Sequence, residues 1–163
     1  MNIIDIVILG ILQGITEFLP VSSSGHLVLA QYLLGIESPG NTLKVLFHIG
    51  TLFIVFYLFN KDIKSIVISL NEKPTQKLVI YIIIATIPAV IIGLIFKSHI
   101  IDLFSSIVPV GYALLSTGVI LTLSINFKNK NKSLSYLYSL LIGLAQAVAI
   151  IPGISRSGTT ISI

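Results

Sequence analysis

The sequence has 163 residues, of which 55% are hydrophobic and only 10% are charged, with a formal net charge of +4. Soluble domains carry about 25% charged residues, so this composition excludes a soluble globular protein and indicates a polytopic membrane protein. The absence of cysteine excludes disulfides, thiol redox chemistry and thiolate metal sites. Nine of the ten cationic residues are lysines, mostly in short connections between apolar runs, a pattern that indicates membrane topology rather than nucleic-acid binding.

Residues 1–43 contain two apolar arms, at 2–19 and 27–36, on either side of the polar stretch FLPVSSSGHL. The second arm has about ten residues, or roughly 15 Å of helix, which is half the thickness of a bilayer. We expect the arms to form a re-entrant pair, because irregular backbone at membrane depth is tolerated where protein or a water-filled cavity surrounds it. No cleaved signal peptide is expected, since the first lysine is Lys44.

Three later apolar runs are predicted to cross the bilayer as helices, at about 44–59, 78–96 and 103–127. The connections 60–77 and 128–132 together contain seven lysines, whereas 97–102 contains one. Cytoplasmic loops are rich in lysine and arginine, so the two lysine-rich connections are predicted to be cytoplasmic. Both ends of residues 1–43 are then predicted to lie on the periplasmic side.

Two polar segments resemble each other, QGITEFLPVSSSG at 13–25 and QAVAIIPGISRSG at 146–158. At an offset of 133 positions the identical pairs are Gly10 and Gly143, Gln13 and Gln146, Ser22 and Ser155, Ser24 and Ser157, and Gly25 and Gly158. Three predicted spans separate the segments, which inverts the second relative to the first and predicts an all-α fold of inverted repeats with re-entrant helix pairs.

The first repeat is predicted to cover 1–132, and residues 133–163 are predicted to begin the second repeat with the first arm and the loop of its re-entrant pair. Two repeats of this length predict a complete protein of about 265 residues, so we interpret the sequence as a truncated form. In such folds the interrupted helices of the two repeats meet near the midplane and form the binding site.

The first polar segment contains candidate catalytic groups. Gln13 and Glu17 are four residues apart and share one helix face, and an ionisable group within an apolar arm is a functional candidate. The alternative for Glu17 is a structural carboxylate paired with Arg156 or with backbone groups. The hydroxyl and amide groups of Ser22, Ser23, Ser24 and Gly25 are expected either to bind an anion or only to cap a helix.

The sequence contains three histidines. His26 follows the serines and is a candidate general acid, base or nucleophile, with a satisfied core histidine as the alternative. His48 and His99 lack such neighbours in the sequence, and we expect them to be structural.

Arg156, the only arginine, lies within the second polar segment. Its planar fork of donors suits phosphate oxygens, so a ligand phosphate is the preferred partner and Glu17 is the alternative. Thr159 and Thr160 add hydroxyls after it. A carboxylate beside a phosphate implies a divalent cation, Mg²⁺ or Ca²⁺, and together these groups predict phosphoryl hydrolysis or anion transport, with a lipid as a fitting substrate.

QGITEFLPVSSSGH and PGISRSGTT closely resemble the two signature motifs of the undecaprenyl-pyrophosphate phosphatases of the bacitracin-resistance type. The resemblance implies a multi-pass protein of the bacterial inner membrane that hydrolyses undecaprenyl pyrophosphate to undecaprenyl phosphate and phosphate. This reaction recycles the carrier lipid of cell-wall synthesis. The resemblance also implies an active site open to the periplasm and a requirement for a divalent cation.

The resemblance assigns metal binding to Gln13 and Glu17, although many members of the family have a second glutamate at the position of Gln13. It implies that Glu17, Ser23, His26 and Arg156 are catalytic, and whether Ser23 or His26 attacks phosphorus stays open. Substrate binding is expected of the remaining polar residues, namely Ser22, Ser24, Gly25, Ser155, Ser157, Gly158 and Thr160. The expected partners are a polyprenyl pyrophosphate and the bilayer, with no nucleic acid, and a homodimer is a candidate assembly.

Two alternatives to a phosphatase are kept. Inverted repeats are common in transporters, so the first is a transporter or flippase that binds the same lipid phosphate without hydrolysing it. The second is an inactive fragment. Glu17 and His26 favour hydrolysis, because transport of an anion gains little from an added carboxylate.

Overall fold

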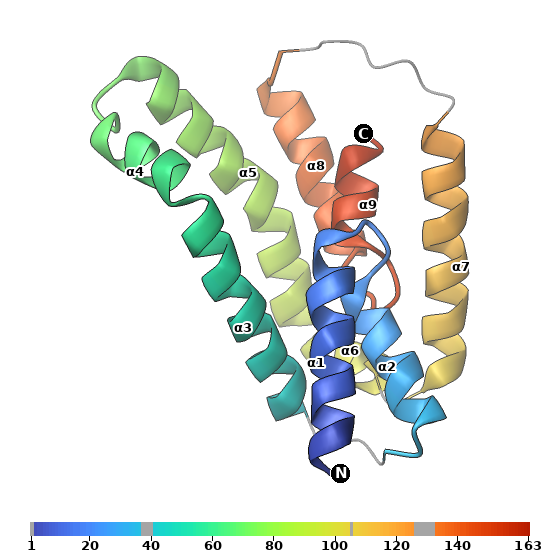
Figure 1. The fold of residues 1–163 in the computed structure, drawn as a ribbon. Coiled ribbons are helices and arrows are strands. Elements are labelled where there is room, and N and C mark those ends of the chain that lie inside the picture. Colours follow the sequence, from blue (N-terminus) through green and yellow to red (C-terminus); the bar gives the residue numbers. More distant parts are fainter. Residues whose placement is uncertain (1, 37–40, 105, 126–132) are drawn as a thin grey trace.

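The computed structural model describes residues 2–36, 41–104, 106–125 and 133–163. Within these ranges the protein is helical and contains no strand. Figure 1 shows the described helices in chain order, namely α1 (Ile3–Phe18), α2 (Ser23–Leu33), α3 (Asn41–Leu58), α4 (Asn60–Ile68), α5 (Lys73–Ile95), α6 (Lys97–Phe104), α7 (Ile107–Ser124), α8 (Tyr136–Val148) and α9 (Arg156–Ile161).

Two of the described helices, α5 and α7, are long and apolar enough to cross a membrane. A third span is formed if α3 and α4, which meet at an angle of 67°, count as one broken helix. The segments 60–77 and 97–102, expected only as connections, contain α4 and most of α6. The lysine-rich segment 128–132 lies outside the described residues.

Two helical hairpins reach toward each other from opposite ends of the molecule (Figure 1). The 16 residues of α1 run inward and the 11 residues of α2 return, while α8 enters from the other end and α9 turns back. At about 1.5 Å per residue, α2 is roughly 16 Å long, which is too short to cross a bilayer. The hairpins therefore have the opposed arrangement expected of the re-entrant pairs in an inverted repeat.

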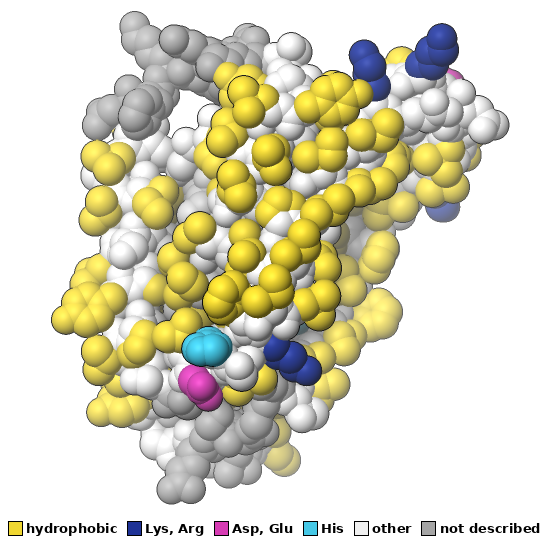
Figure 2. Space-filling view, turned by 180° about the vertical axis from the view of Figure 1, so that it is seen from behind, with side chains coloured by type: hydrophobic (Ala, Val, Ile, Leu, Met, Phe, Trp, Pro, Cys, Tyr) yellow, Lys and Arg dark blue, Asp and Glu magenta, His cyan; other side chains and the backbone are white. Residues whose placement is uncertain are grey.

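The burial pattern is that of a membrane protein. Among the described residues, polar or charged side chains are buried about as often as apolar ones. The buried polar residues include Gln13, Gln31, Thr117 and Ser139. Large apolar side chains such as Ile82 on α5 are instead exposed. Figure 2 shows hydrophobic side chains covering much of one face, with lysine or arginine at its upper end. An apolar exterior around a polar interior suits a lipid environment, so the chain is an integral membrane protein.

The tips of the two hairpins are held together by close backbone packing. A Cβ at Gly25 would lie 2.8 Å from the Cα of Gly153, so a larger residue at Gly25 would separate the loops. Gly153 itself has φ +104°, a conformation that L-residues rarely adopt. Both α2 and α9 pack on α7, where Thr117 donates to the Gly153 carbonyl (2.8 Å) and accepts from the Ser155 amide (3.0 Å).

Candidate active site

The two loops have the same local structure. In the first, Ser22 precedes α2 and its Oγ accepts a hydrogen bond from the Gly25 amide. In the second, Ser155 precedes α9 and its Oγ accepts from the Gly158 amide. Each capping hydroxyl also contacts the hydroxyl two residues later, Ser24 at 3.4 Å and Ser157 at 3.2 Å. The residues identical in the sequence repeat thus make equivalent hydrogen bonds, and the serines act as helix caps.

The carboxylate of Glu17 is the centre of a polar cluster beside the first loop. Its Oε2 accepts a hydrogen bond of 2.5 Å from the Ser23 hydroxyl and one of 2.9 Å from the Gln13 amide nitrogen. The Nε2 of His48 lies 3.7 Å from the same oxygen. Because α1 supplies Glu17 and Gln13, α2 supplies Ser23 and α3 supplies His48, the cluster depends on the packing of three helices.

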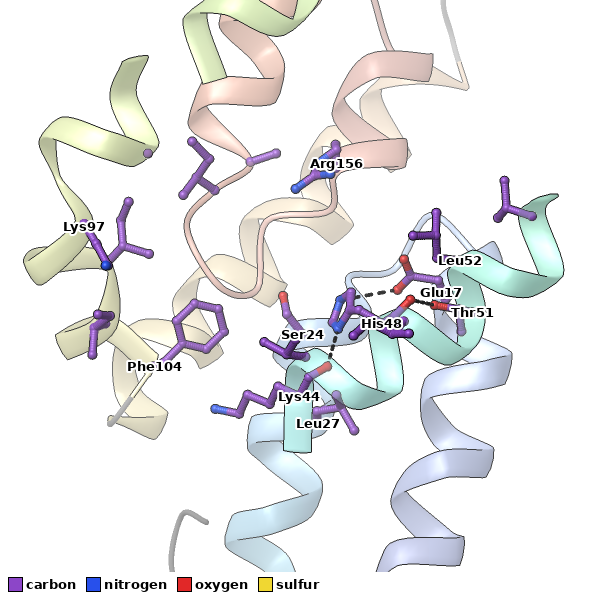
Figure 3. A pocket seen from close by; sticks show the side chains of 18 residues that line it. Glu17, Ser24, Leu27, Lys44, His48, Thr51, Leu52, Lys97, Phe104 and Arg156 are labelled. Atoms are coloured by element: carbon purple, nitrogen blue, oxygen red, sulfur yellow. Dashed lines mark hydrogen bonds and ion pairs between the residues drawn. The ribbon is translucent and has the colours of Figure 1, made fainter. Parts of the chain in front are cut away.

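Two adjoining cavities open on this cluster. The smaller, of about 200 Å³, is polar and is lined by both loops, including Glu17, Ser23 and Arg156. The larger, of about 750 Å³, is mostly apolar and is drawn in Figure 3. Glu17, Ser24, His48, Ala149 and Arg156 line both. A small polar cavity continuous with a large apolar one suits a molecule with an anionic head and an apolar tail.

Arg156 reaches the site from the second hairpin and begins α9. Arg156 is exposed, and in the described structure it forms no ion pair within 4 Å with Glu17. The nitrogen that lies within this distance of the Glu17 carboxylate as a possible charge partner is Nε2 of His48. The alternative that Arg156 serves to neutralise Glu17 is therefore not favoured by the geometry. The guanidinium remains open to a ligand in the polar cavity.

The structure separates His26 from this cluster and places His48 in it. His26 lines another cavity, between α2 and α7, and its Nδ1 lies 2.9 Å from the Ser22 carbonyl. His48 lies beside Glu17 (Figure 3), and its Nδ1 donates to the Lys44 carbonyl at 2.8 Å. An ionisable residue within an apolar run was the available sequence signal for His48. His99, on α6, contacts Ser98 and Phe96 and lines neither cavity.

The other predicted binding residues have differing positions. Ser22, Ser24, Ser155 and Ser157 line the polar cavity. Gly25 and Gly158 are buried, and their amides are engaged by the capping serines rather than directed at a ligand. The Thr160 hydroxyl donates to the Arg156 carbonyl at 2.9 Å, and Thr160 is not among the residues that line the cavity.

The donor set around Glu17 suits a hard cation only if the ligand contributes oxygens. No group of three or more His, Cys, Asp or Glu side chains lies together in the described ranges. However, the buried Gln13 Oε1 has no hydrogen-bond partner among the described residues, and it lies on the amide that contacts Glu17. The Glu17 and Gln13 oxygens with phosphate oxygens would form an oxygen-only site, which Mg²⁺ and Ca²⁺ prefer.

Comparison with known proteins identifies the family. The model of the bacitracin resistance protein BacA family matches residues 6–163. The chain belongs to the BacA family. It is 49% identical over 164 residues to an undecaprenyl-diphosphatase of Halothermothrix orenii, covering 99% of this chain and 62% of that protein. It is also 45% identical to an undecaprenyl-diphosphatase of Desulforapulum autotrophicum, over 96% of this chain and 64% of that protein.

The chain therefore spans somewhat under two thirds of the length of these BacA relatives. A third relative, undecaprenyl-diphosphatase 4 of Bacillus thuringiensis, is 43% identical over 164 residues, and the chain covers 62% of its length as well. The matched region contains both motifs whose residues line the polar cavity. The family resemblance seen in those motifs is thus confirmed along nearly the whole chain.

Proposed function

We propose that this chain carries the active site of an undecaprenyl-pyrophosphate phosphatase, which releases inorganic phosphate and returns undecaprenyl phosphate to cell-wall synthesis. The observation that carries the proposal is the hydrogen bond from Ser23 to Glu17 at the junction of the polar and apolar cavities. A hydroxyl that donates to a carboxylate, with an arginine at the same cavity, is an arrangement for attack on a phosphate. The names of the relatives support the same activity.

The geometry favours Ser23 over His26 as the nucleophile. Ser23 lines the polar cavity with Glu17 and Arg156, whereas His26 lines a different cavity. In the proposed reaction the Ser23 proton passes to Glu17 as Oγ bonds to the terminal phosphorus and the bond to the bridging oxygen breaks. Glu17 gives this proton up with the departing undecaprenyl phosphate and is again a carboxylate. Water then attacks the phosphoserine, its proton passes to Glu17, and Glu17 protonates the Ser23 oxygen as phosphate leaves.

Arg156 and the first turn of α2 supply positive charge around the transferred phosphate. The amides of Ser23 and Ser24 precede the first intrahelical hydrogen bond, that of the His26 amide to the Ser22 carbonyl, so they lie at the positive end of the helix. Fixed donors of this kind typically contribute about 3–4 kcal/mol to the stabilisation of the transition state.

A divalent cation is proposed as the cofactor, with Glu17 and Gln13 as its protein ligands. When bound, Mg²⁺ or Ca²⁺ would neutralise charge on the pyrophosphate oxygens. The orphan Gln13 Oε1 supports this assignment, since a cation would give that buried oxygen a partner.

The proposed location is the bacterial inner membrane with the site open to the periplasm. The support is the lysine distribution, because Lys61 and Lys64 of α4 and Lys73 of α5 lie together at the end of the molecule away from the start of α3. A homodimer stays a candidate assembly. A transporter role gains no support beyond the fold, whereas the Ser23 and Glu17 contact favours hydrolysis.

The test is phosphate release from farnesyl pyrophosphate by the purified protein in detergent, with Mg²⁺, with Ca²⁺ and with a chelator. We expect metal-dependent turnover that Ser23→Ala and Glu17→Gln each reduce by at least about 100-fold. Gln13→Glu, which restores the residue common in the family, should be tolerated. Glu72→Gln, at an exposed carboxylate before α5, is the control and should match the unaltered protein.

Binding of the lipid without phosphate release from the unaltered protein would contradict the proposal and favour transport. Normal, metal-dependent turnover by Glu17→Gln would contradict the assignment of Glu17.

A further inference from the structure

Lys44 is a buried cation that the proposed reaction does not use. It lies in the first turn of α3 and is 8% exposed. Its ammonium nitrogen lies 4.8 Å from the centre of the Phe104 ring at the end of α6. Among the described residues, no carboxylate oxygen lies within 4 Å of the Lys44 ammonium.

This position is unfavourable for a lysine on two grounds. Burial removes water from the ammonium, and a buried charge in a membrane protein is generally paired with an opposite charge. The first turn of a helix has a positive electrostatic potential, which disfavours a cation. The face of Phe104 offers an attraction to the ammonium, but this interaction does not neutralise its charge.

The cavity beside Lys44 is strongly cationic for an apolar cavity. Lys44, Lys97 and Arg156 line it from α3, α6 and α9, and Figure 3 shows them around its wall. Glu17 is the one carboxylate among the described lining residues, and its Oε2 already accepts hydrogen bonds from the Ser23 hydroxyl and the Gln13 amide. A ligand with several negative charges would therefore balance this wall, whereas a neutral lipid would leave it uncompensated.

We propose that Lys44, assisted by Lys97, forms a second phosphate-binding subsite in the larger cavity, whereas Ser23 lines only the adjoining polar cavity and Arg156 lines both. The inference rests on the proposed function, because a diphosphate presents two phosphate groups. The ligand is a phosphate-class anion, either the phosphate that remains attached to the lipid or free inorganic phosphate. Lys44 is thereby a determinant of the preference for lipid diphosphates over less charged lipids.

The experiment measures binding without turnover by the purified protein in detergent. The probes are the non-hydrolysable methylene analogue of farnesyl pyrophosphate, farnesyl monophosphate and inorganic phosphate. We expect Lys44→Met to weaken binding of the analogue about tenfold and Lys44→Arg to weaken it less, since arginine keeps the charge. Lys61→Met, at an exposed lysine of α4 far from the cavity, is the matched control and should bind normally.

The pattern of losses identifies the source of the anion. Weaker binding of the analogue with unchanged binding of inorganic phosphate assigns the subsite to the lipid phosphate. Weaker binding of inorganic phosphate alone assigns it to the free anion. Unchanged affinity of Lys44→Met for all three probes would overturn the proposal while leaving the proposed function intact.

Folding and hydrolysis are followed separately. The melting temperature of each variant reports folding, and where Lys44→Met is not recovered folded, Lys97→Met replaces it because Lys97 is exposed. A Lys97→Met protein with normal affinity for all three probes would then overturn the proposal. Failure of the unaltered protein to hydrolyse farnesyl pyrophosphate counts against the proposed function alone, since the binding measurements still decide the role of Lys44.

Discussion

Ser23 and Arg156 occupy equivalent positions of the two repeats, 133 residues apart, and each is the first residue of its short helix. The capping serines before them are identical, but one repeat presents a hydroxyl and the other a guanidinium. Similarly, Glu17 in the first repeat is replaced by Ile150 in the second, and both line the larger cavity. The two loops thus share their backbone geometry, and their differing side chains bring a hydroxyl and a guanidinium to the same polar cavity.

Arg156 is expected to act on the substrate rather than on the fold, because it is exposed and makes no ion pair with Glu17 in the described part of the structure. Arg156→Ala should lower turnover of farnesyl pyrophosphate by about 10²–10³. Arg156→Lys should lie between it and the unaltered protein, since lysine keeps the charge without the bidentate fork. Melting temperatures in detergent should change little.

A structural role for Arg156 makes the opposite prediction. Arg156→Ala would then be unstable, and adding Glu17→Ala would restore its stability. A stable Arg156→Ala protein with normal turnover would exclude the catalytic role.

Substitutions of His26 can distinguish a catalytic role of its imidazole from structural support of the first loop. Its Nδ1 donates to the carbonyl of Ser22, a residue held at φ 67°. Asn places an amide N–H near the position of Nδ1 but has no acid–base function. If His26 supports the loop, His26→Asn should keep much more activity than His26→Ala in the phosphate-release assay. Equal and complete loss in both variants would favour the catalytic role predicted from the motif.

At the level of elements, α7 holds the second loop in place. Thr117 is buried and makes two hydrogen bonds to that loop, to the carbonyl of Gly153 and from the amide of Ser155. Gly153 lies so close to α7 that a Cβ there would be 2.6 Å from the Val110 carbonyl. The second loop therefore has little freedom to shift without losing contact with the helix.

Thr117→Val should destabilise the protein, because it leaves a buried amide and a buried carbonyl without their partner, at a cost of about 1–3 kcal/mol. The melting temperature in detergent should fall by roughly 5 °C. Turnover should also fall, because Ser155 and Arg156 directly follow the loop that Thr117 holds. Thr122→Val is the matched control, since Thr122 is on the same helix and donates to the Gly118 carbonyl of its own helix. Equal stability of the two variants would contradict the role of Thr117.

At the level of the whole molecule, the hairpins and the long helices define two sides. Asn2 and the end of α2 lie at one end of the molecule, and the turn between α4 and α5 lies at the other (Figure 1). Lys44 and Phe104, which line the larger cavity, belong to α3 and α6, and α3 begins at the first end (Figure 1). The orientation of these two ends therefore decides whether this part of the larger cavity lies toward the periplasm or toward the cytoplasm.

The chain has no cysteine, so single cysteines report this orientation cleanly. Cysteines at Asn2 and Leu34 should both react with an impermeant thiol reagent added to intact cells, because both ends of the first hairpin are predicted to face the periplasm. A cysteine at the exposed Asn71, between α4 and α5, should react only after the cells are lysed. Labelling of only one of Asn2 and Leu34 would contradict the re-entrant pair, and reversed labelling of all three would contradict the orientation.

The sequence by itself determined the class of protein and the two polar segments. Low charge and long apolar runs leave a membrane as the environment, because helices satisfy their own backbone groups in lipid. The repeat around Ser22 and Ser155 predicted paired loops, since capping chemistry is local and depends on residues three positions apart. The motifs also identified Glu17, Ser23 and Arg156, all of which line the polar cavity.

Only the tertiary structure decided which side chains share a cavity. His26 follows the serines directly in the sequence, which suggested that it shares their site. The direction of its side chain depends on how α2 is rotated against α7, and His26 lines the cavity between these two helices. His48 and Lys44 belong to α3, and its apolar sequence does not indicate which other helices it packs against. In the structure, packing brings His48 to Glu17 of α1 and Lys44 to Phe104 of α6. These contacts arise from the crossing of α1, α3 and α6, which local sequence patterns do not determine.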